Sequence, residues 1–259
     1  MLALYHEWDS LMSFKVRACL AEKQLAWQSR RVSLRDFEHL RPAYLVLNPA
    51  GVVPTLVHNQ QVICESSHIN EYLDQAFQPS LVPERAELRD SMRSWCGYFD
   101  EVIHPTLRVA SFQLMIRQRF MCMSQQDVQA LIRHHPQPAR AQAFQNLVDT
   151  PVDYQAVLTS IEKLYEVATL MEQRLQQTLW LAGNGFSLAD IASMALLDRI
   201  DRLGFDFIWR NKPALAGWIE RVRARPAFSQ AACLAQFRMP APRAEDLAKL
   251  GSLLAQQGL

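Results

Sequence analysis

The sequence lacks the features that mark several specialised classes of protein. Its 259 residues include only 8 glycines and 13 prolines, which excludes collagen-like and low-complexity chains. No apolar run approaches the ~20 residues that a membrane-spanning helix needs. The polar residues His6 and Glu7 come too early for the apolar stretch of a signal peptide. We therefore expect a cytoplasmic globular protein with no membrane contact.

The sequence also has little charge imbalance and few cysteines. Its 27 Lys and Arg residues against 26 Asp and Glu residues leave a net charge of +1, which offers no attraction to nucleic acid. Because C-x-x-C is absent, we expect buried, reduced thiols and no metal site. The pair His134-His135 lies in a polar stretch before a proline and is predicted to be a loop. The five cysteines are Cys19, Cys64, Cys96, Cys122 and Cys233.

The sequence contains enough hydrophobic residues, 49% of the total, to form a substantial core. The first eighty residues change their hydrophobic period repeatedly, which predicts a small α/β unit of order βαβ, α, ββ, α. The first two strands should be parallel and the last two an antiparallel hairpin, because only Asn59-Gln60 separates them. The predicted elements are strands at Leu2–Tyr5, Gln28–Ser33, Val53–His58 and Gln61–Cys64, a helix from Ser13, a partly helical segment at Asp36–Leu47, and a helix at Ser66–Phe77.

A linker around Gln78-Pro79-Ser80 and Pro83 separates this unit from a second one, in which every strong pattern is helical. We therefore expect two domains, at residues 1–78 and 84–259. In the second, Pro105 cannot donate a backbone hydrogen bond and should kink a long helix. The predicted helices are Glu84–Arg119, Tyr154–Gln177, Ser187–Leu203, Pro213–Arg223 and Ala244–Gln257, with uncertain polar segments at Ser124–Pro138 and Arg140–Asp149.

Two serines, Ser10 and Ser13, lie between the first predicted strand and the first predicted helix. In a thioredoxin-like βαβ unit, a C-x-x-C redox pair would occupy this place. The helix N-terminus there offers free N–H groups and a positive dipole, which stabilise a thiolate. A serine cannot exchange disulfides, but its hydroxyl can donate a hydrogen bond to a thiolate that a co-substrate supplies. The alternative is that Ser13 only caps the helix.

Two further motifs lie at the start of the hairpin and just after it. Proline in Val53-Pro54 is badly placed within a strand, and a cis peptide bond would explain it and would turn the Val53 backbone toward a peptide-like ligand. Glu65 can bind an ammonium, and Ser66 opens a helix whose N-terminus can bind a carboxylate. Together they suit an amino-acid head group, although an ordinary helix cap remains the alternative. In the second domain, Ser187 and Asp190 form a capping box with a structural role.

These motifs, in this order and over nearly the whole chain, resemble the cytosolic glutathione S-transferase family. The stretches that resemble it are LYHEWDSLMSFKVRACLAEKQL, NPAGVVPTL with ESSHINEYLD, FSLADIASMALLDRI and KPALAGWIERVRARPAF. The resemblance implies an α/β thioredoxin-like domain that binds glutathione as co-substrate, an all-α domain that supplies most of the second pocket, and a homodimer. An enzyme would join the thiolate to a small hydrophobic electrophile, by conjugation, ether cleavage or dehalogenation. A non-catalytic interaction or regulatory protein with the same fold is the alternative.

The resemblance also implies roles for single residues. Glu65 and Ser66 would hold the γ-glutamyl head, and Val53 with Pro54 would pair with the cysteinyl backbone. Trp8-Asp9-Ser10 is similar to the tau and zeta branches, in which Trp8 would contact glutathione and Ser10 would activate the thiol. The bacterial β-etherase branch resembles the second domain as well, and there the serine would be Ser13.

The predicted site departs from the family pattern at one position, and the sequence outlines only part of the second pocket. Many members have lysine where this chain has Val52, so His39 or Arg41 would have to hold the glycyl carboxylate. For the second pocket, the four-residue steps of Asp100, His104 and Arg108 place these side chains on one helix face, which Phe112 and Met115 extend. This face is interpreted as a pocket wall that binds the electrophile. A mixed core and solvated face is the alternative.

Overall fold

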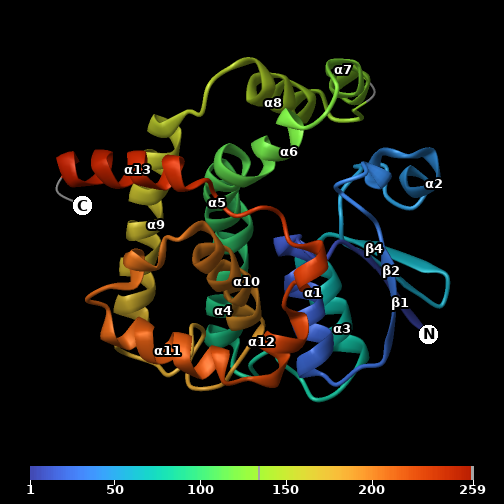
Figure 1. Cartoon of the computed structure of the whole chain (residues 1–259). Helices are drawn as coiled ribbons and strands as arrows, with labels where there is room; N and C mark the ends of the chain where they lie inside the picture. Colours follow the sequence, from blue (N-terminus) through green and yellow to red (C-terminus); the bar gives the residue numbers. More distant parts are fainter. Residues whose placement is uncertain (134, 258–259) are drawn as a thin grey trace.

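The first 76 residues build a four-stranded sheet with helices, and helices follow as far as Gln257 (Figure 1). The computed structural model describes residues 1–133 and 135–257. In the first part, the strands are β1 (Leu2–His6), β2 (Trp27–Arg31), β3 (Thr55–His58) and β4 (Gln61–Cys64). The helices are α1 (Leu11–Glu22), a 3-10 turn (Glu38–Leu40), α2 (Pro42–Leu45) and α3 (Ser66–Ala76). The predicted element order of this part is confirmed.

The sheet has the order β2-β1-β3-β4, with β1 and β2 parallel and the other pairs antiparallel. Asn59 and Gln60 have φ values of 48° and 70°, as a two-residue hairpin with a primed turn requires. Leu2 and Leu4 alternate inward along β1 and join Leu56 of β3 in the core under α1 and α3. The predicted parallel pair and hairpin are therefore confirmed.

Two element boundaries differ from the prediction, and both matter for the site. Helix α1 begins at Leu11, not Ser13, because Ser10 is the N-cap: its Oγ accepts a hydrogen bond from the N–H of Ser13 at 3.2 Å. Strand β3 begins at Thr55, after Pro54, which has no N–H for a ladder. The Val53–Pro54 peptide bond is cis, as predicted.

The second part is helical, and its only strand pairing within the described residues is an isolated bridge between Trp180 and Gly183. The elements are α4 (Ala86–Tyr98), π-helical turns at Phe99–Ile103 and Phe112–Ile116 on either side of α5 (His104–Ser111), α6 (Arg117–Met121), α7 (Gln125–Arg133), α8 (Pro138–Asp149), α9 (Tyr154–Leu175), α10 (Leu188–Leu203), a 3-10 turn (Asp206–Trp209), α11 (Pro213–Arg223), α12 (Pro226–Ala231), a 3-10 turn (Ala235–Phe237) and α13 (Ala244–Gln257). Helix α12, the two 3-10 turns and the two π-helical turns were not expected.

The long helix predicted to break at His104-Pro105 remains helical from α4 to α6. In an α-helix the N–H of residue 105 would bond to the carbonyl of Glu101, and proline has no N–H to donate. Glu101 lies in the π-helical turn Phe99–Ile103, so the hydrogen-bond pattern changes just before the proline. The chain accommodates Pro105 by this turn, and α5 continues toward the cleft described below.

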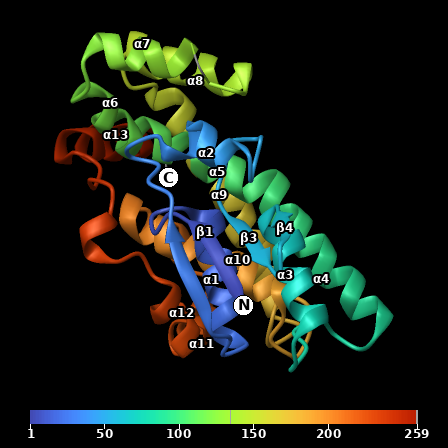
Figure 2. The same ribbon diagram turned by 90° about the vertical axis from the view of Figure 1, so that its right-hand side faces the viewer.

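Helices α7 and α8 lie side by side beyond the end of α5 and α6 (Figures 1 and 2). They pack through a small separate core of Phe120, Val128, Phe144 and Leu147. They also contact the first part, because Gln137 Nε2 donates to the Ala50 carbonyl at 3.0 Å. Gly51, with φ of 60°, allows close contact there, since a methyl group on it would lie 3.1 Å from Cγ of Pro136.

Two smaller predictions have a clear outcome. The Ser187/Asp190 capping box is present, and the buried Asp190 also accepts from the indole N–H of Trp218 at 2.9 Å. The five cysteines are free, but the expectation that they are buried holds only for Cys19 and Cys233, since Cys64 and Cys96 are half-buried and Cys122 is exposed. His134 lies outside the described residues, and His135 follows it without helix or strand structure. No helix in the described part of the chain is long and apolar enough to cross a membrane.

Candidate functional site

A cleft of about 1310 Å³ lies between the loop ends of the sheet and helices α5, α6 and α8. From the first part, its walls include the N-terminus of α1, residues 50–54 and the start of α3. From the second, they include α5 and α8 and the segment Gln236–Pro240. The cleft brings together the predicted site residues except Trp8, Ser13 and Arg41, and Met115, which was predicted to extend the pocket wall, is fully buried outside the cleft. Those within it are Ser10, His39, Val53, Pro54, Glu65, Ser66, His104, Arg108 and Phe112.

Ser10 presents its hydroxyl to this cleft at the N-terminus of α1. Its oxygen accepts from the Ser13 N–H, and its own proton is donated to no atom of the described residues. The first N–H groups of a helix have no partner within the helix, and the dipole there favours negative charge. A thiolate placed here would receive the Ser10 O–H and the field of α1.

Ser13 is arranged differently, three residues further along the same helix. Its side chain is fully buried, and its Oγ accepts from the Glu7 N–H at 3.4 Å. It does not line the cleft. Ser13 therefore joins α1 to the end of β1, where a bound thiol does not reach it without displacing other residues.

Trp8 and Arg17 hold the loop that leads to Ser10. The Trp8 ring stacks on Phe237 at 6.5 Å between centroids and lies under the Arg17 guanidinium at 4.7 Å. Arg17 is buried and donates to the carbonyls of Glu7, Trp8 and Ala231. Trp8 thus fixes the loop from behind, and the prediction that it contacts glutathione receives no support from its position.

Asp9 fastens the same loop to the second part of the chain. Its buried carboxylate lies 2.9 Å from Arg199 Nη2 and 2.6 Å from Arg202 Nη2, and it accepts the backbone N–H of Met239. Nothing in the sequence pairs Asp9 with arginines 190 and 193 residues away. These arginines were missed because an ion pair between distant helical positions has no local signal.

Glu65 and Ser66 lie where β4 gives way to α3. Glu65 is exposed to the cleft, and its φ of 67° is unusual for a residue other than glycine. Such strained residues are concentrated at functional sites. Ser66 is buried at the first position of α3, and its Oγ contacts Met12 Sδ at 3.2 Å. A free carboxylate therefore lies next to a helix N-terminus, as an amino-acid head group requires.

A buried lysine fixes the start of α3 against α1 and the helical wall. Lys15 Nζ donates to Ser67 Oγ at 2.6 Å and to Asp100 Oδ1 at 2.7 Å, and Ser67 also bonds to Asp100. Asp100 lies in the first π-helical turn. It shares the cleft with His104 and Arg108, as predicted from their spacing, but its carboxylate is already bound.

Of the residues expected to hold the cysteinyl and glycyl parts of glutathione, the structure places Val53 and His39 in the cleft and Arg41 outside it. Val53 lines the cleft, and its backbone forms no hydrogen bond within the described chain. His39 also lines it, and its buried Nδ1 has no partner among described residues. Burial lowers the pKa of His39 to about 3, so the ring is neutral at pH 7. Arg41 is exposed outside the cleft and pairs with Glu38 at 3.5 Å.

The helical wall contains aromatic and cationic side chains. Burial lowers the pKa of His104 to about 4, which leaves it neutral. The Arg108 guanidinium lies 4.7 Å from the centre of the Phe112 ring, and Phe112 stacks on Phe144 at 5.8 Å and 9°. Phe144 and Arg140, both from α8, also line the cleft. Sequence reasoning missed them because the polar α8 pattern does not show where that helix docks.

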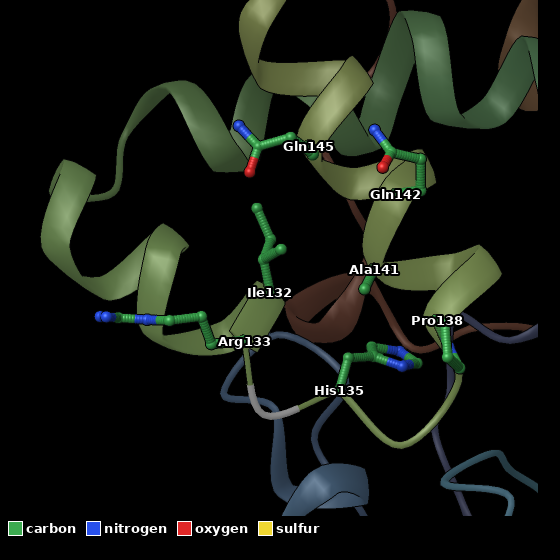
Figure 3. Close-up of a pocket in the computed structure, with 7 residues that line it drawn as sticks. All are labelled: Ile132, Arg133, His135, Pro138, Ala141, Gln142 and Gln145. Carbon is green, nitrogen blue, oxygen red and sulfur yellow. The ribbon is translucent and has the colours of Figure 1, made fainter.

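A second, smaller cavity of about 290 Å³ lies between α7 and α8 (Figure 3). Amide groups of Gln142 and Gln145 line one side, and the ring of His135 lies beside Pro138 on the other. It contains no predicted site residue, and no group of three metal-ligating side chains occurs among the described residues. The chemistry suggested by Ser10 and Glu65 belongs to the larger cleft.

Comparison with known protein families gives two matches in chain order. Residues 9–76 match the glutathione S-transferase N-terminal domain, and residues 115–226 match the glutathione S-transferase C-terminal domain. Among curated proteins, Protein LigF of Sphingobium sp. is 29% identical over 88% of this chain and 92% of its own length. Glutathione S-transferase F9 of Arabidopsis thaliana is 26% identical over 86% and 91%.

Solved structures give the same result in three dimensions. The crystal structure titled beta-etherase LigF from Sphingobium sp. strain SYK-6 superimposes with a TM-score of 0.81 at 27% identity, covering 89% of this chain and 98% of that one. Glutathione transferase F7 from Populus trichocarpa, at 24% identity and a TM-score of 0.72, supports the fold. Both superpositions cover 89% of this chain.

Proposed function

The chain belongs to the glutathione S-transferase family, with glutathione as its co-substrate, and we propose that Ser10 activates the glutathione thiol for attack on a hydrophobic electrophile. The observation that supports this most is the position of the Ser10 hydroxyl in the cleft, with its oxygen occupied by the Ser13 N–H and its proton free to donate. Ser13, buried and bonded to Glu7, is the weaker of the two candidates.

The chemistry follows from the ionisation of the thiol. A free thiol has a pKa near ~8.5, so only a few per cent is thiolate at neutral pH. The Ser10 O–H and the N-terminus of α1 would both stabilise the anion. Lowering the pKa by about two corresponds to ~2.7 kcal/mol. The serine donates a hydrogen bond throughout and forms no covalent bond to substrate.

Glutathione would lie along the sheet side of the cleft. Glu65 would receive the γ-glutamyl ammonium, Ser66 and the start of α3 the adjacent carboxylate, and the unbonded Val53 backbone the cysteinyl amide. His39 would face the glycyl end, with Val52 contributing no charge. We propose further that residues 1–78 form this glutathione-binding domain and residues 84–259 the co-substrate domain. A homodimer and a cytoplasmic location remain predictions.

Ether cleavage is the reaction best supported among conjugation, ether cleavage and dehalogenation. Its support is the likeness to a protein whose structure is titled a beta-etherase. In such a step the thiolate sulfur attacks carbon, a C–S bond forms, the C–O bond breaks, and the oxygen leaves with the electron pair and takes up a proton. His104 lies on the opposite wall, where it would stabilise a leaving oxygen.

Turnover with a panel of aryl ethers, aryl halides and activated alkenes tests this proposal. Ser10→Ala should reduce turnover about 10²-fold on the best substrate, since it removes a preorganised donor. Ser13→Ala should reduce it less. A larger loss in Ser13→Ala, with the protein still folded, would assign thiol activation to Ser13 instead.

Calorimetric titration with glutathione tests the part of the proposal that concerns glutathione binding. Glu65→Ala should abolish measurable binding, because an unpaired ammonium in the cleft costs about 2–5 kcal/mol. Val52→Lys should strengthen it, most clearly at low salt. If the wild-type protein binds no glutathione at millimolar concentration, the proposal fails.

A further inference from the structure

Two arginines of the helical wall line the large cleft without a hydrogen-bond or ion-pair partner among the described residues. Arg108, on α5, and Arg140, in the first turn of α8, are both half-buried and line the large cleft. Within the described residues neither guanidinium forms a hydrogen bond or an ion pair. Two buried or half-buried pairs show the contrast, Arg31 with Glu7 and Arg199 with Asp9, whereas Arg35, which also lines the cleft, is exposed to solvent.

These two cations also act on each other. Burial lowers the pKa of Arg140, and the positive charge of Arg108 lowers it further. Glu65 is the carboxylate that most favours the charged form of Arg140, and glutathione binding would occupy it with an ammonium. A partly desolvated cation without a partner is unfavourable, and two that repel each other are more so. An anion between them would relieve both costs.

The surroundings of the pair suit a flat apolar ligand. Phe112 and Phe144 stack beside Arg108 and line the same cleft, next to the buried Phe120. Aromatic side chains bind planar rings through offset or edge contacts. Arginine binds carboxylates with two parallel N–H donors. The wall therefore combines an aromatic surface that can bind a flat ring with two arginines that can bind a carboxylate, here called the carboxylate receptor.

We propose that Arg108 and Arg140 together bind a carboxylate of the co-substrate, with its aromatic ring against the Phe112–Phe144 stack. This inference rests on the proposed function, because it assigns the second substrate of the same cleft. It specifies the co-substrate as an aromatic acid whose electrophilic carbon points toward Ser10 on the opposite wall. Another source of the same chemistry is the glycyl carboxylate of glutathione, and the experiment separates the two.

The test compares two probes of the same shape, naphthalene-2-carboxylate and naphthalene-2-carboxamide, by calorimetry with and without saturating glutathione. The wild-type protein should bind the carboxylate about tenfold or more tighter, as for hydrogen bonds between charged groups. Arg108→Gln and Arg140→Gln should each lose about tenfold for the carboxylate and less than about threefold for the carboxamide. Arg140→Lys, which retains the charge, should keep part of the preference.

Arg133→Gln is the matched control, since Arg133 is exposed on α7 of the same helix pair and lies outside the large cleft. It should bind both probes as the wild-type protein does. Melting curves of all variants identify any that fail to fold, and Arg140→Lys then decides the result. Equal binding of the two probes by the wild-type protein, or equal losses for both in the glutamine variants, would overturn the proposal.

Glutathione and its glycyl ethyl ester distinguish the two sources of carboxylate. If Arg140→Gln weakens binding of glutathione but not of the ester, while the naphthalene preference is unchanged, the pair holds the glycyl end and the co-substrate proposal is wrong. If the wild-type protein discriminates between the probes but does not bind glutathione, the carboxylate receptor stands and the proposed function fails.

Discussion

The two walls of the cleft differ in whether their buried and half-buried charges are paired within the described residues. On the sheet side, Glu7, Asp9 and Lys15 are each paired at 3.0 Å or less, and the loop that presents Ser10 is held from several directions. On the helical side, Arg108 and Arg140 face the cleft without a partner in the described chain. The paired charges hold the glutathione side of the cleft in one geometry. The two unpaired arginines remain available to bind the co-substrate.

The largest effect should come from breaking a pair on the sheet side. Asp9→Asn leaves Arg199 and Arg202 buried without their anion, which should lower the free energy of unfolding by about 3–5 kcal/mol. Thermal or urea unfolding measures it. The matched control is Asp201→Asn, whose partner Arg223 is nearly half exposed, and it should cost less than about 1 kcal/mol. Equal losses would contradict the contrast between buried and surface pairs.

Protonation of His6 should make the free energy of unfolding depend on pH. Its buried ring lies 3.2 Å from Arg17 Nη1, so Nδ1 must accept and stay unprotonated, while Nε2 lies 2.8 Å from Ser29 Oγ. Burial, with Arg17 and Arg31 nearby, lowers the pKa of His6 to about 3 from its ordinary 6.5. The unfolded chain therefore binds the extra proton first. The contribution of His6 to stability is therefore complete above pH ~6.5 and should fall by about 1.4 kcal/mol per pH unit below it, until pH ~3.

His6→Gln removes this contribution and should flatten the fall in unfolding free energy between pH 6.5 and 4 relative to the wild-type protein. His68→Gln, at an exposed position, should retain the wild-type slope. A slope that is the same in all three proteins would show that protonation of His6 is not linked to folding.

On the helical side, removing a charge should cost little. Arg108→Gln and Arg140→Gln break no ion pair and relieve a repulsion, so each should change the free energy of unfolding by less than about 1 kcal/mol, in either direction. Urea unfolding without ligands is the measurement. A loss as large as that of Asp9→Asn would mean that these arginines have structural partners.

The smallest effect is expected at Arg41, which the sequence placed in the glutathione site. Since it lies outside the cleft and pairs with Glu38 at the surface, Arg41→Gln should alter glutathione affinity by less than about twofold and stability by less than about 1 kcal/mol. Calorimetry on this variant beside Val52→Lys checks it. A strong loss of glutathione binding in Arg41→Gln would restore it to the site.

Local pattern accounts for what could be predicted from the sequence. The change from strand to helix period, the two-residue hairpin and the Ser187/Asp190 box depend on neighbours within a few residues. Each therefore appears in the structure close to its expected place. The helix start was misplaced by two residues, because Ser10 and Ser13 are equally good caps in isolation. The structure distinguishes them, because Ser10 Oγ accepts the Ser13 N–H as the cap, whereas Ser13 Oγ accepts the N–H of Glu7.

Contacts between distant segments could not be predicted. The Asp9 pairs join residues about 190 positions apart, and Arg140 enters the cleft only because α8 docks near Ala50 and Gly51. Burial of Ser13 and exposure of Arg41 likewise result from packing that no spacing records. The sheet side of the site was therefore largely predictable, and the helical side only as far as the regular steps from Asp100 to Phe112.

The pKa of the thiol in bound glutathione tests the central claim most directly, and the thiolate's ultraviolet absorbance during a pH titration reports it. In the wild-type protein it should lie about two below the ~8.5 of a free thiol. In Ser10→Ala the thiol pKa should return most of the way to that of a free thiol, which corresponds to a loss of up to ~2.7 kcal/mol of thiolate stabilisation. In Ser13→Ala it should stay near the wild-type value while the protein melts earlier. A thiol pKa unchanged by Ser10→Ala but raised by Ser13→Ala would contradict the assignment of Ser10.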